Sequence, residues 1–367
     1  MYLVIFTSFV ALLLTFLESK KIMRNGMKWG VVLVTFLGCV HYDYGNDYMS
    51  YLNIYRDVTR YDFDLNGILS KVYFREPGWA LLCWLFKPIG GFFVMVAVLN
   101  IIQNSIVYHF ILREVDKAWW PMAIFVYLFS TSYYLMSFSM MRQEFVIIVF
   151  LGLWRYIKSR KWWIALAILY LCTFVHISAL ALLPFAFWGF MPMEKGEFIG
   201  IVYLVFLLLL WFGQDFTREI FIMSMNSEDV VKYADAYGNS TNTIKIGVGF
   251  VLNLIPIILS LLFLFKKKKQ YTVEERQLVA LAIVANLIIP FTSIIPLVGR
   301  LSMYFSVYNI AACPLIYGNI ERKDLRFVLA GIMIFMLSYD YVLFFYNPVW
   351  EEKYSEFHTI FPLILNQ

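Results

Sequence analysis

The sequence predicts an all-α protein, a polytopic transmembrane helical bundle of about 12 spans. Hydrophobic residues make up 61% of the 367 residues, charged residues 15%, and the mean hydropathy is +0.71. A soluble protein of this length would be far less apolar. Continuous apolar runs such as Ile201–Phe212 do not alternate as the strands of a transmembrane barrel would.

The spans are delimited by the charged residues that flank each apolar stretch. Residues 2–17 lack the basic leading region and the cleavage site of a signal peptide, so the first stretch is expected to stay in the chain. Residues 77–87 are too short to cross and are predicted to form an interfacial or re-entrant helix. We expect residues 1–367 to form one integral membrane domain. The predicted spans are 3–17, 28–41, 90–112, 119–137, 142–157, 162–175, 177–191, 198–213, 245–265, 277–294, 301–318 and 326–345.

The distribution of lysine and arginine predicts the orientation of the bundle. With the amino terminus outside, 19 of the 30 basic residues fall in the inner loops, as the positive-inside rule requires. Three longer polar segments then lie outside: residues 42–76, residues 214–244 and the tail 346–367. The run Lys266–Lys269 is explained as an orientation signal that also contacts anionic lipid.

The outer segments are rich in tyrosine, aspartate and asparagine. Aromatic rings beside carboxylates suit carbohydrate, whose C–H faces stack while its hydroxyls need acceptors. The alternative is an aromatic belt at the membrane interface, and both interpretations stay open for the loops as a whole. The candidate sugar-contacting residues are Tyr48, Tyr51, Lys232, Tyr233 and Tyr237.

Two arginines stand where predicted spans begin on the outer side. Arg142 and Arg300 each follow a short, mostly apolar turn, and Gln143 lies beside the first of them. The amino-terminal end of a helix carries unpaired N–H groups and a partial positive charge, so a guanidinium there favours phosphate or diphosphate. A lipid-headgroup contact is the alternative for either arginine alone.

One histidine is the candidate for proton transfer. His176 lies at an outer turn between two apolar spans, where an ionisable group is costly and is a functional candidate by default. Histidine also suits proton transfer near neutral pH. A hydrogen-bonded structural role is the alternative, and His41, His109 and His358 are weaker candidates.

Several acids accompany these groups. Glu76-Pro77-Gly78 has the pattern of a helix start, and Glu76 is also a candidate base that Arg75 could hold in place. Asp47 follows Gly45, which permits a tight turn and close approach to a ligand. Asp340, near the outer end of the last span, is a costly acid that needs a partner.

No metal site is predicted. The chain has no HExxH motif and no CxxC pair, and its four cysteines are scattered through apolar sequence. Asp62-Phe63-Asp64 has the letters of a DxD motif, which recurs often by chance. We therefore expect no metal and no cofactor.

In order and in residue type, these motifs resemble the EpsG family, relatives of the Wzy polysaccharide polymerases. The resemblance covers residues 41–305. It implies a glycosyltransferase that joins lipid-linked oligosaccharide repeats into exopolysaccharide, capsule or O-antigen. The matching pieces are Gly45-Asn46-Asp47-Tyr48 with Tyr51, Glu76-Pro77-Gly78, Met141-Arg142-Gln143, His176-Ile177-Ser178, and Gly299-Arg300 with Tyr304-Phe305.

The resemblance and the residues together predict the parts of a reaction. Arg142 and Arg300 would bind the diphosphate of an undecaprenyl-linked glycan, and His176, or else Asp47 or Glu76, would take the acceptor proton. The expected setting is the outer side of a bacterial plasma (inner) membrane. Expected partners are the undecaprenyl-diphosphate-linked oligosaccharide, membrane lipid, and a chain-length regulator and flippase of the same pathway, with no nucleic acid.

Other classes stay open at this point. A flippase or exporter of lipid-linked glycan would also have many spans, but ionisable groups near the bilayer midplane and repeated halves are expected of it. A ligase, or an enzyme using a polyprenyl-phosphate sugar, is chemically closer. The acids of the first outer loop, Asp43, Asp47, Asp62 and Asp64, keep the last option open.

The predicted orientation is testable by cysteine labelling. In a cysteine-free background, cysteines at positions 142, 176 and 300 are expected to react with a membrane-impermeant maleimide added to the outside of intact cells. A cysteine at position 322 should react only after permeabilisation. Labelling of positions 142, 176 and 300 from opposite sides would contradict the assignment.

Overall fold

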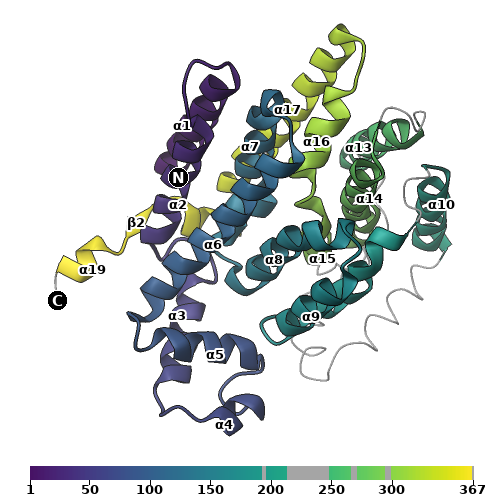
Figure 1. The fold of residues 1–367 in the computed structure, drawn as a ribbon. Helices are drawn as coiled ribbons and strands as arrows, with labels where there is room; N and C mark the ends of the chain where they lie inside the picture. Colours follow the sequence, from purple (N-terminus) through teal and green to yellow (C-terminus); the bar gives the residue numbers. More distant parts are fainter. Residues whose placement is uncertain (192–195, 213–247, 266–270, 294–298, 366–367) are drawn as a thin grey trace. The chain divides into compact units, whose positions relative to one another are not determined.

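The chain begins with two helices that pack against each other, α1 (Tyr2–Ser19) and α2 (Gly26–Val40). Both are almost entirely apolar, and helix α6 (Gly91–Glu114) also packs on α2 (Figure 1). The computed structural model describes residues 1–191, 196–212, 248–265, 271–293 and 299–365. All statements about structure below concern these residues.

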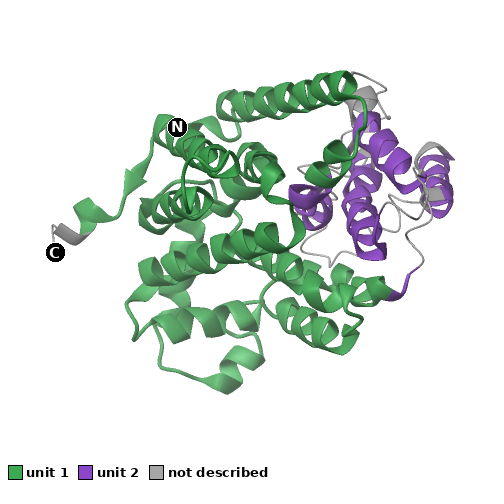
Figure 2. Ribbon diagram, turned by 45° about the horizontal axis from the view of Figure 1, so that its top comes forward, with its two compact units in different colours: residues 1–189, 313–367 green, residues 190–312 purple. Residues whose placement is uncertain are grey.

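The chain divides into two compact units. Unit 1 comprises Met1–Gly189 and Cys313–Gln367, and unit 2 comprises Phe190–Ala312 (Figure 2). Each unit is described here by itself.

In unit 1, helix α6 is the centre of the packing. It contacts α2, α5 (Pro77–Phe86) and α8 (Met141–Lys158), and α8 in turn packs on α9 (Trp162–Thr173). At the ends of α6 and α8, Lys158 Nζ lies 2.7 Å from Glu114 Oε1. Between α6 and α8 the chain passes through the short turn η1 (Lys117–Trp119), α7 (Trp120–Phe129) and the π-helical segment η2 (Thr131–Leu135). The 3-10 segment η3 (Ile177–Phe190) follows α9.

Unit 2 is built from helices that contact their neighbours in sequence. Helix α10 (Gly196–Phe212) packs on α13 (Val248–Phe265), α13 on α14 (Val273–Ile288), and α14 on both η4 (Ile289–Ser293) and α15 (Gly299–Ser306). Helix α14 starts at a capping box, in which Thr272 Oγ1 accepts from Glu275 N at 3.1 Å.

The all-α class is confirmed, and a helix lies at each of the predicted spans. Among the described residues, three helices are long and apolar enough to cross a membrane individually, namely α1, α6 and α17 (Lys323–Tyr346). The other helices are shorter or, like α8, carry more charged residues, and the number of crossings stays a prediction. The expected span 301–318 is interrupted, because α15 ends at Ser306 and α16 (Asn309–Gly318) follows. The expected short helix at residues 77–87 is present as α5.

The predicted outer loop 42–76 contains two helices that hydropathy did not indicate, α3 (Tyr48–Thr59) and α4 (Leu65–Leu69). Helix α3 is amphipathic: Tyr51, Leu52 and Tyr55 are buried, in one apolar cluster with Trp79 and Trp84 of α5. Residues 48–69 therefore form a folded helical layer beside α5 and α6. The predicted loop 214–244 lies outside the described residues.

The carboxy-terminal tail folds back onto the start of this layer. Strand β2 (His358–Thr359) pairs antiparallel with β1 (His41–Tyr42), and Lys353 Nζ lies 3.3 Å from Asp43 Oδ2. Short helices α18 (Glu351–Tyr354) and α19 (Phe361–Leu365) flank β2. Fully buried Tyr354 donates its hydroxyl proton to the carbonyl of Leu135 at 2.9 Å. We call residues 349–360 the C-terminal clamp.

Tyr354→Ala is expected to lower the free energy of unfolding by about 3–5 kcal/mol, because a large aromatic side chain is lost from a closed site. Tyr354→Phe removes only the hydrogen bond and should cost about 1 kcal/mol. Equilibrium unfolding in detergent measures both, with exposed Glu352→Ala as the control. Equal stability of Tyr354→Ala and the control would contradict a structural role for the clamp.

Candidate active site

Two loops of unit 1 meet through their backbones. Pro77 opens α5 with Glu76 as its N-cap in extended conformation, and Gly78 N donates to Phe174 O at 2.8 Å. A Cβ at position 78 would lie 2.8 Å from the carbonyl carbon of Phe174, so only glycine allows this approach. The contact sets the start of α5 beside the turn that carries His176.

The carboxylate of Glu76 joins three segments of the chain. Its Oε2 accepts from Nη1 of Arg142, and its Oε1 accepts from the backbone N–H of Ile177 at 3.2 Å. Nδ1 of His176 also lies 3.2 Å from Oε1. The Glu76 side chain is 8% exposed, against 23% for Arg142 and 21% for His176. The carboxylate is thus the buried centre of the group, and the cation and the imidazole lie nearer its edge.

Arg142 is held flat between aromatic rings. Its guanidinium carbon lies 5.4 Å from the ring centroid of Tyr51 and 5.1 Å from that of Phe74, and Nε donates to the Tyr51 hydroxyl at 3.5 Å. Arg142 is in the first turn of α8, where helical N–H groups add positive potential. A guanidinium has five N–H donors, and these contacts engage only two nitrogens. The arrangement can therefore accept an oxyanion.

Asp47 occupies a neighbouring turn. Its backbone N–H donates to Ser139 Oγ at 3.2 Å, and the same hydroxyl lies 3.4 Å from Asp47 Oδ2. Gly45 has φ +109°, and a Cβ there would lie 2.5 Å from Phe138 O. The close approach expected at Gly45 is therefore made to the chain itself, four residues before Arg142. The turn formed by residues 45–47 therefore packs against the segment that leads into Arg142.

The predicted residues of this region differ in burial. Tyr51 contacts Arg142, whereas Tyr48 is fully buried and donates its hydroxyl to His41 O at 3.2 Å. Tyr48 thus packs the core and does not present a ring to a ligand, contrary to the prediction. Gln143 is buried next to Arg142. Arg75 is exposed, and Arg142 forms an ion pair with Glu76.

His41 shows what a structural histidine looks like in this chain. Its ring is 1% exposed between Tyr48 and Phe138, and Nδ1 lies 2.6 Å from the carbonyl of Gly38. His176, partly exposed beside a carboxylate, is in a different environment.

The remaining predicted residues lie elsewhere. Arg300 is exposed in the first turn of α15, confirming the expected helix start, and belongs to unit 2. Tyr304 is fully buried in the core of unit 2, so it is a packing residue in this structure. Asp340 is exposed on α17, and the described residues give it no ion pair, contrary to the partner expected for it. Lys232, Tyr233 and Tyr237 lie outside the described residues.

Phe74, one of the two rings against Arg142, was not predicted. Its place directly before Arg75-Glu76 carries no signal by itself. A useful clue would have been the aromatic residues on both sides of Glu76, since arginine packs well on rings.

Within the described ranges, no three His, Cys, Asp or Glu side chains are grouped so that they could hold a metal ion. The DxD letters have a local explanation, because Asp64 caps α4 by accepting from Asn66 N at 3.0 Å.

The fold and the site define a helical membrane protein with a partly buried carboxylate–arginine–histidine group suited to an anionic substrate. A family model described as the EpsG family matches residues 29–358, and the chain belongs to this family. The EpsG family consists of Wzy-like proteins of the polysaccharide polymerase type. No curated protein and no solved structure matches the chain.

Gly78→Ala is expected to destabilise the protein by about 1–3 kcal/mol, because the added methyl group overlaps the Phe174 carbonyl. Gly331→Ala is the matched control, since nothing lies within 4 Å of a Cβ at that position and alanine favours a helix. Thermal unfolding in detergent measures the difference. Equal melting temperatures for the two variants would show that the loop contact contributes nothing.

Proposed function

We propose that this protein is a membrane glycosyltransferase that polymerises undecaprenyl-diphosphate-linked oligosaccharide repeats into a surface polysaccharide. The reaction would take place on the outer side of the plasma membrane. Membership of the EpsG family supports the polysaccharide polymerase class. The observation that carries the chemistry is the contact of one carboxylate, Glu76, with both Arg142 and His176.

Arg142 is the proposed diphosphate-binding group. Its ion pair with Glu76 and the rings of Tyr51 and Phe74 fix the plane of the guanidinium before substrate arrives. Preorganised positive charge of this kind stabilises the negative charge that grows on a leaving diphosphate. Arg300 is the proposed second guanidinium, at the start of α15.

His176 is the proposed general base. Glu76 Oε1 beside Nδ1 would fix the orientation of the ring and stabilise the imidazolium that forms, as a carboxylate does for a catalytic histidine. Nε2 is then the atom that accepts the proton of the acceptor hydroxyl. The hydroxyl oxygen forms the new bond to the anomeric carbon, and the bond from that carbon to the diphosphate oxygen breaks.

Glu76 itself is a positioning residue in this scheme. Its two oxygens are engaged by Arg142, by the Ile177 N–H and by the His176 ring, so it is a poorer base than the sequence alone suggested. The leaving group is activated by its diphosphate, and the proposed reaction calls for no nucleotide.

The contacts of the first outer segment bear on the main alternative. An enzyme using a polyprenyl-phosphate sugar would be expected to use acids of this segment. Asp43 is paired with Lys353 of the C-terminal clamp, and Asp64 caps α4. Asp47 contacts Ser139, which is three residues before Arg142 in the chain. The proposed role of Asp47 is to bind sugar hydroxyls.

Arg142→Ala is expected to lower the polymerisation rate by roughly 10²–10³, and His176→Ala by roughly 10²–10⁴. Purified protein is incubated with one defined lipid-linked repeat and a chelator, and a ladder of lengthening glycan is read on a gel. Arg155→Ala, on the same helix, and His109→Ala, on α6, are matched controls and should keep the ladder.

Normal ladders from both Arg142→Ala and His176→Ala would exclude the proposed site. Movement of the lipid-linked repeat across liposomes without new glycosidic bonds would instead favour an exporter.

A further inference from the structure

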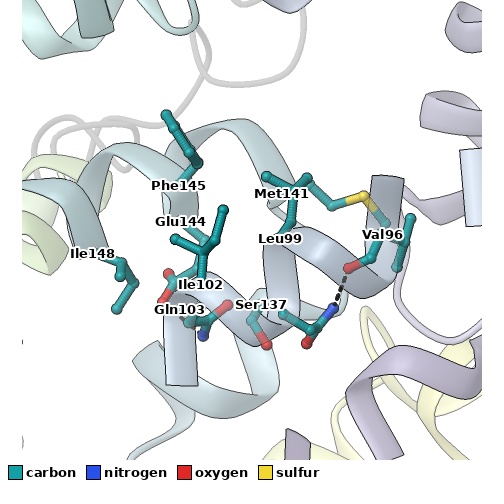
Figure 3. A pocket seen from close by; sticks show the side chains of 10 residues that line it. Val96, Leu99, Ile102, Gln103, Ser137, Met141, Glu144, Phe145 and Ile148 are labelled. Atoms are coloured by element: carbon teal, nitrogen blue, oxygen red, sulfur yellow. Dashed lines mark hydrogen bonds between the residues drawn. The ribbon is translucent and has the colours of Figure 1, made fainter. Parts of the chain in front are cut away.

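The proposed reaction leaves one deeply buried carboxyl unexplained. Glu144 lies two residues after Arg142 in α8 and is 2% exposed. It lines a small cavity of about 20 Å³ with Asn100 and Gln103 of α6, Ser137 and apolar side chains (Figure 3). A volume of this size admits one water molecule or one small ion, and no sugar.

The contacts of Glu144 are few and neutral. Gln103 Nε2 donates to Oε1 at 3.4 Å, and Oε2 has no hydrogen-bond partner among the described residues. The same Gln103 amide lies 3.3 Å from the hydroxyl of Tyr127, which donates to Asn104 Oδ1 at 2.9 Å. In the part of the chain that the structure describes, no ion pair includes Glu144.

The charged groups nearest along these helices are engaged elsewhere. Arg142 pairs with Glu76, and Lys158 pairs with Glu114 at the other end of α6 and α8. Tyr127 of α7 is the titratable group that faces Glu144, and its hydroxyl is part of the Gln103–Asn104 network. Nothing in these contacts supplies a positive charge to Glu144.

The contact of Glu144 with α6 is at the middle of that helix. Gln103 is 12 residues after Gly91, in a helix of 24 residues. An ionised carboxylate buried to this degree, with one neutral donor, would be very costly. A proton on the carboxyl, or a cation in the cavity, removes this cost.

We propose that Glu144 and the cavity beside it form a binding site for a single small cation, either a proton or Na⁺. A proton binds covalently to Oε2 and gives the cavity a donor. A sodium ion would take the carboxylate oxygen, and Ser137, Asn100 and Gln103 are the other polar residues that line the cavity. The proposal does not depend on the glycosyl-transfer function, because it concerns the charge state of α8.

The test uses full-length protein in detergent at constant ionic strength. Melting temperature is measured in NaCl and in choline chloride, and infrared spectra are recorded for the carbonyl stretch of a protonated carboxyl. If Na⁺ is the occupant, a concentration near ten times its Kd should raise Tm by roughly 2–4 °C. If a proton is the occupant, Tm is insensitive to Na⁺ and the carboxyl band is present.

Glu144→Gln must remove whichever signal the unsubstituted protein shows. Glu114→Gln is the matched control: it breaks an ion pair on the same helix pair and must retain the signal. Should Glu144→Gln fail to fold, Gln103→Leu takes its place. Loss of its hydrogen bond must then shift the carboxyl band or change the half-saturating Na⁺ concentration about threefold.

Two results would overturn the proposal. One is a protein that shows neither the Na⁺ effect nor the protonated carboxyl band. The other is a Glu144→Gln protein that keeps the same signal as the parent.

Discussion

The contact on which the candidate site depends is the one between the Glu76 carboxylate and two groups far away in sequence. Arg142 is 66 positions from Glu76, and Ile177 is 101. A carboxylate at this degree of burial is stable only while its partners remain, and loss of one leaves an uncompensated charge. The same contact therefore assembles the site and restricts the positions that Arg142 and the His176 turn can take.

Two glycines make that assembly sterically possible. Gly78 lets the start of α5 touch the Phe174 carbonyl, and Gly45 lets the Asp47 turn touch the Phe138 carbonyl. Each glycine places a functional turn against a backbone segment that ends a few residues before His176 or Arg142. The C-terminal clamp contacts the Asp47 turn through Gly45 N, which donates to Lys353 O. It also contacts the chain before Phe138 through the Tyr354 hydroxyl, which donates to Leu135 O. Two of the walls around the charged group are thus set by backbone contacts, which do not vary with side-chain rotamers.

Hydropathy and charge predicted the helices well, because both properties are summed over many residues and tolerate local irregularity. They did not predict α3 within residues 42–76, since its amphipathic pattern has a mean hydropathy near that of a loop. Residue types indicated Glu76, Arg142 and His176 as candidates, and the structure brings these three together, but the pairing of Arg142 with Glu76 depends on tertiary contact. The same limit explains why Tyr48 and Tyr304 were predicted to bind substrate but are buried. The sequence of an aromatic-rich segment does not show which tyrosines face a ligand and which pack in the core.

Glu144 was missed because an acid in the first turn of a helix has an ordinary explanation, its attraction to the helix dipole. Attraction to the helix dipole is not sufficient in the folded protein, because Glu144 is buried with one neutral hydrogen-bond donor. Positions 142 and 144 differ by roughly 200° around an α-helix, so the guanidinium that neutralises Glu76 on one face cannot serve Glu144 on the other. One turn of α8 thus presents a cation toward Glu76 and a carboxyl toward the neutral amides of α6. The first arrangement suits an anion, and the second requires a positive charge from a proton or an ion, because the described chain supplies none.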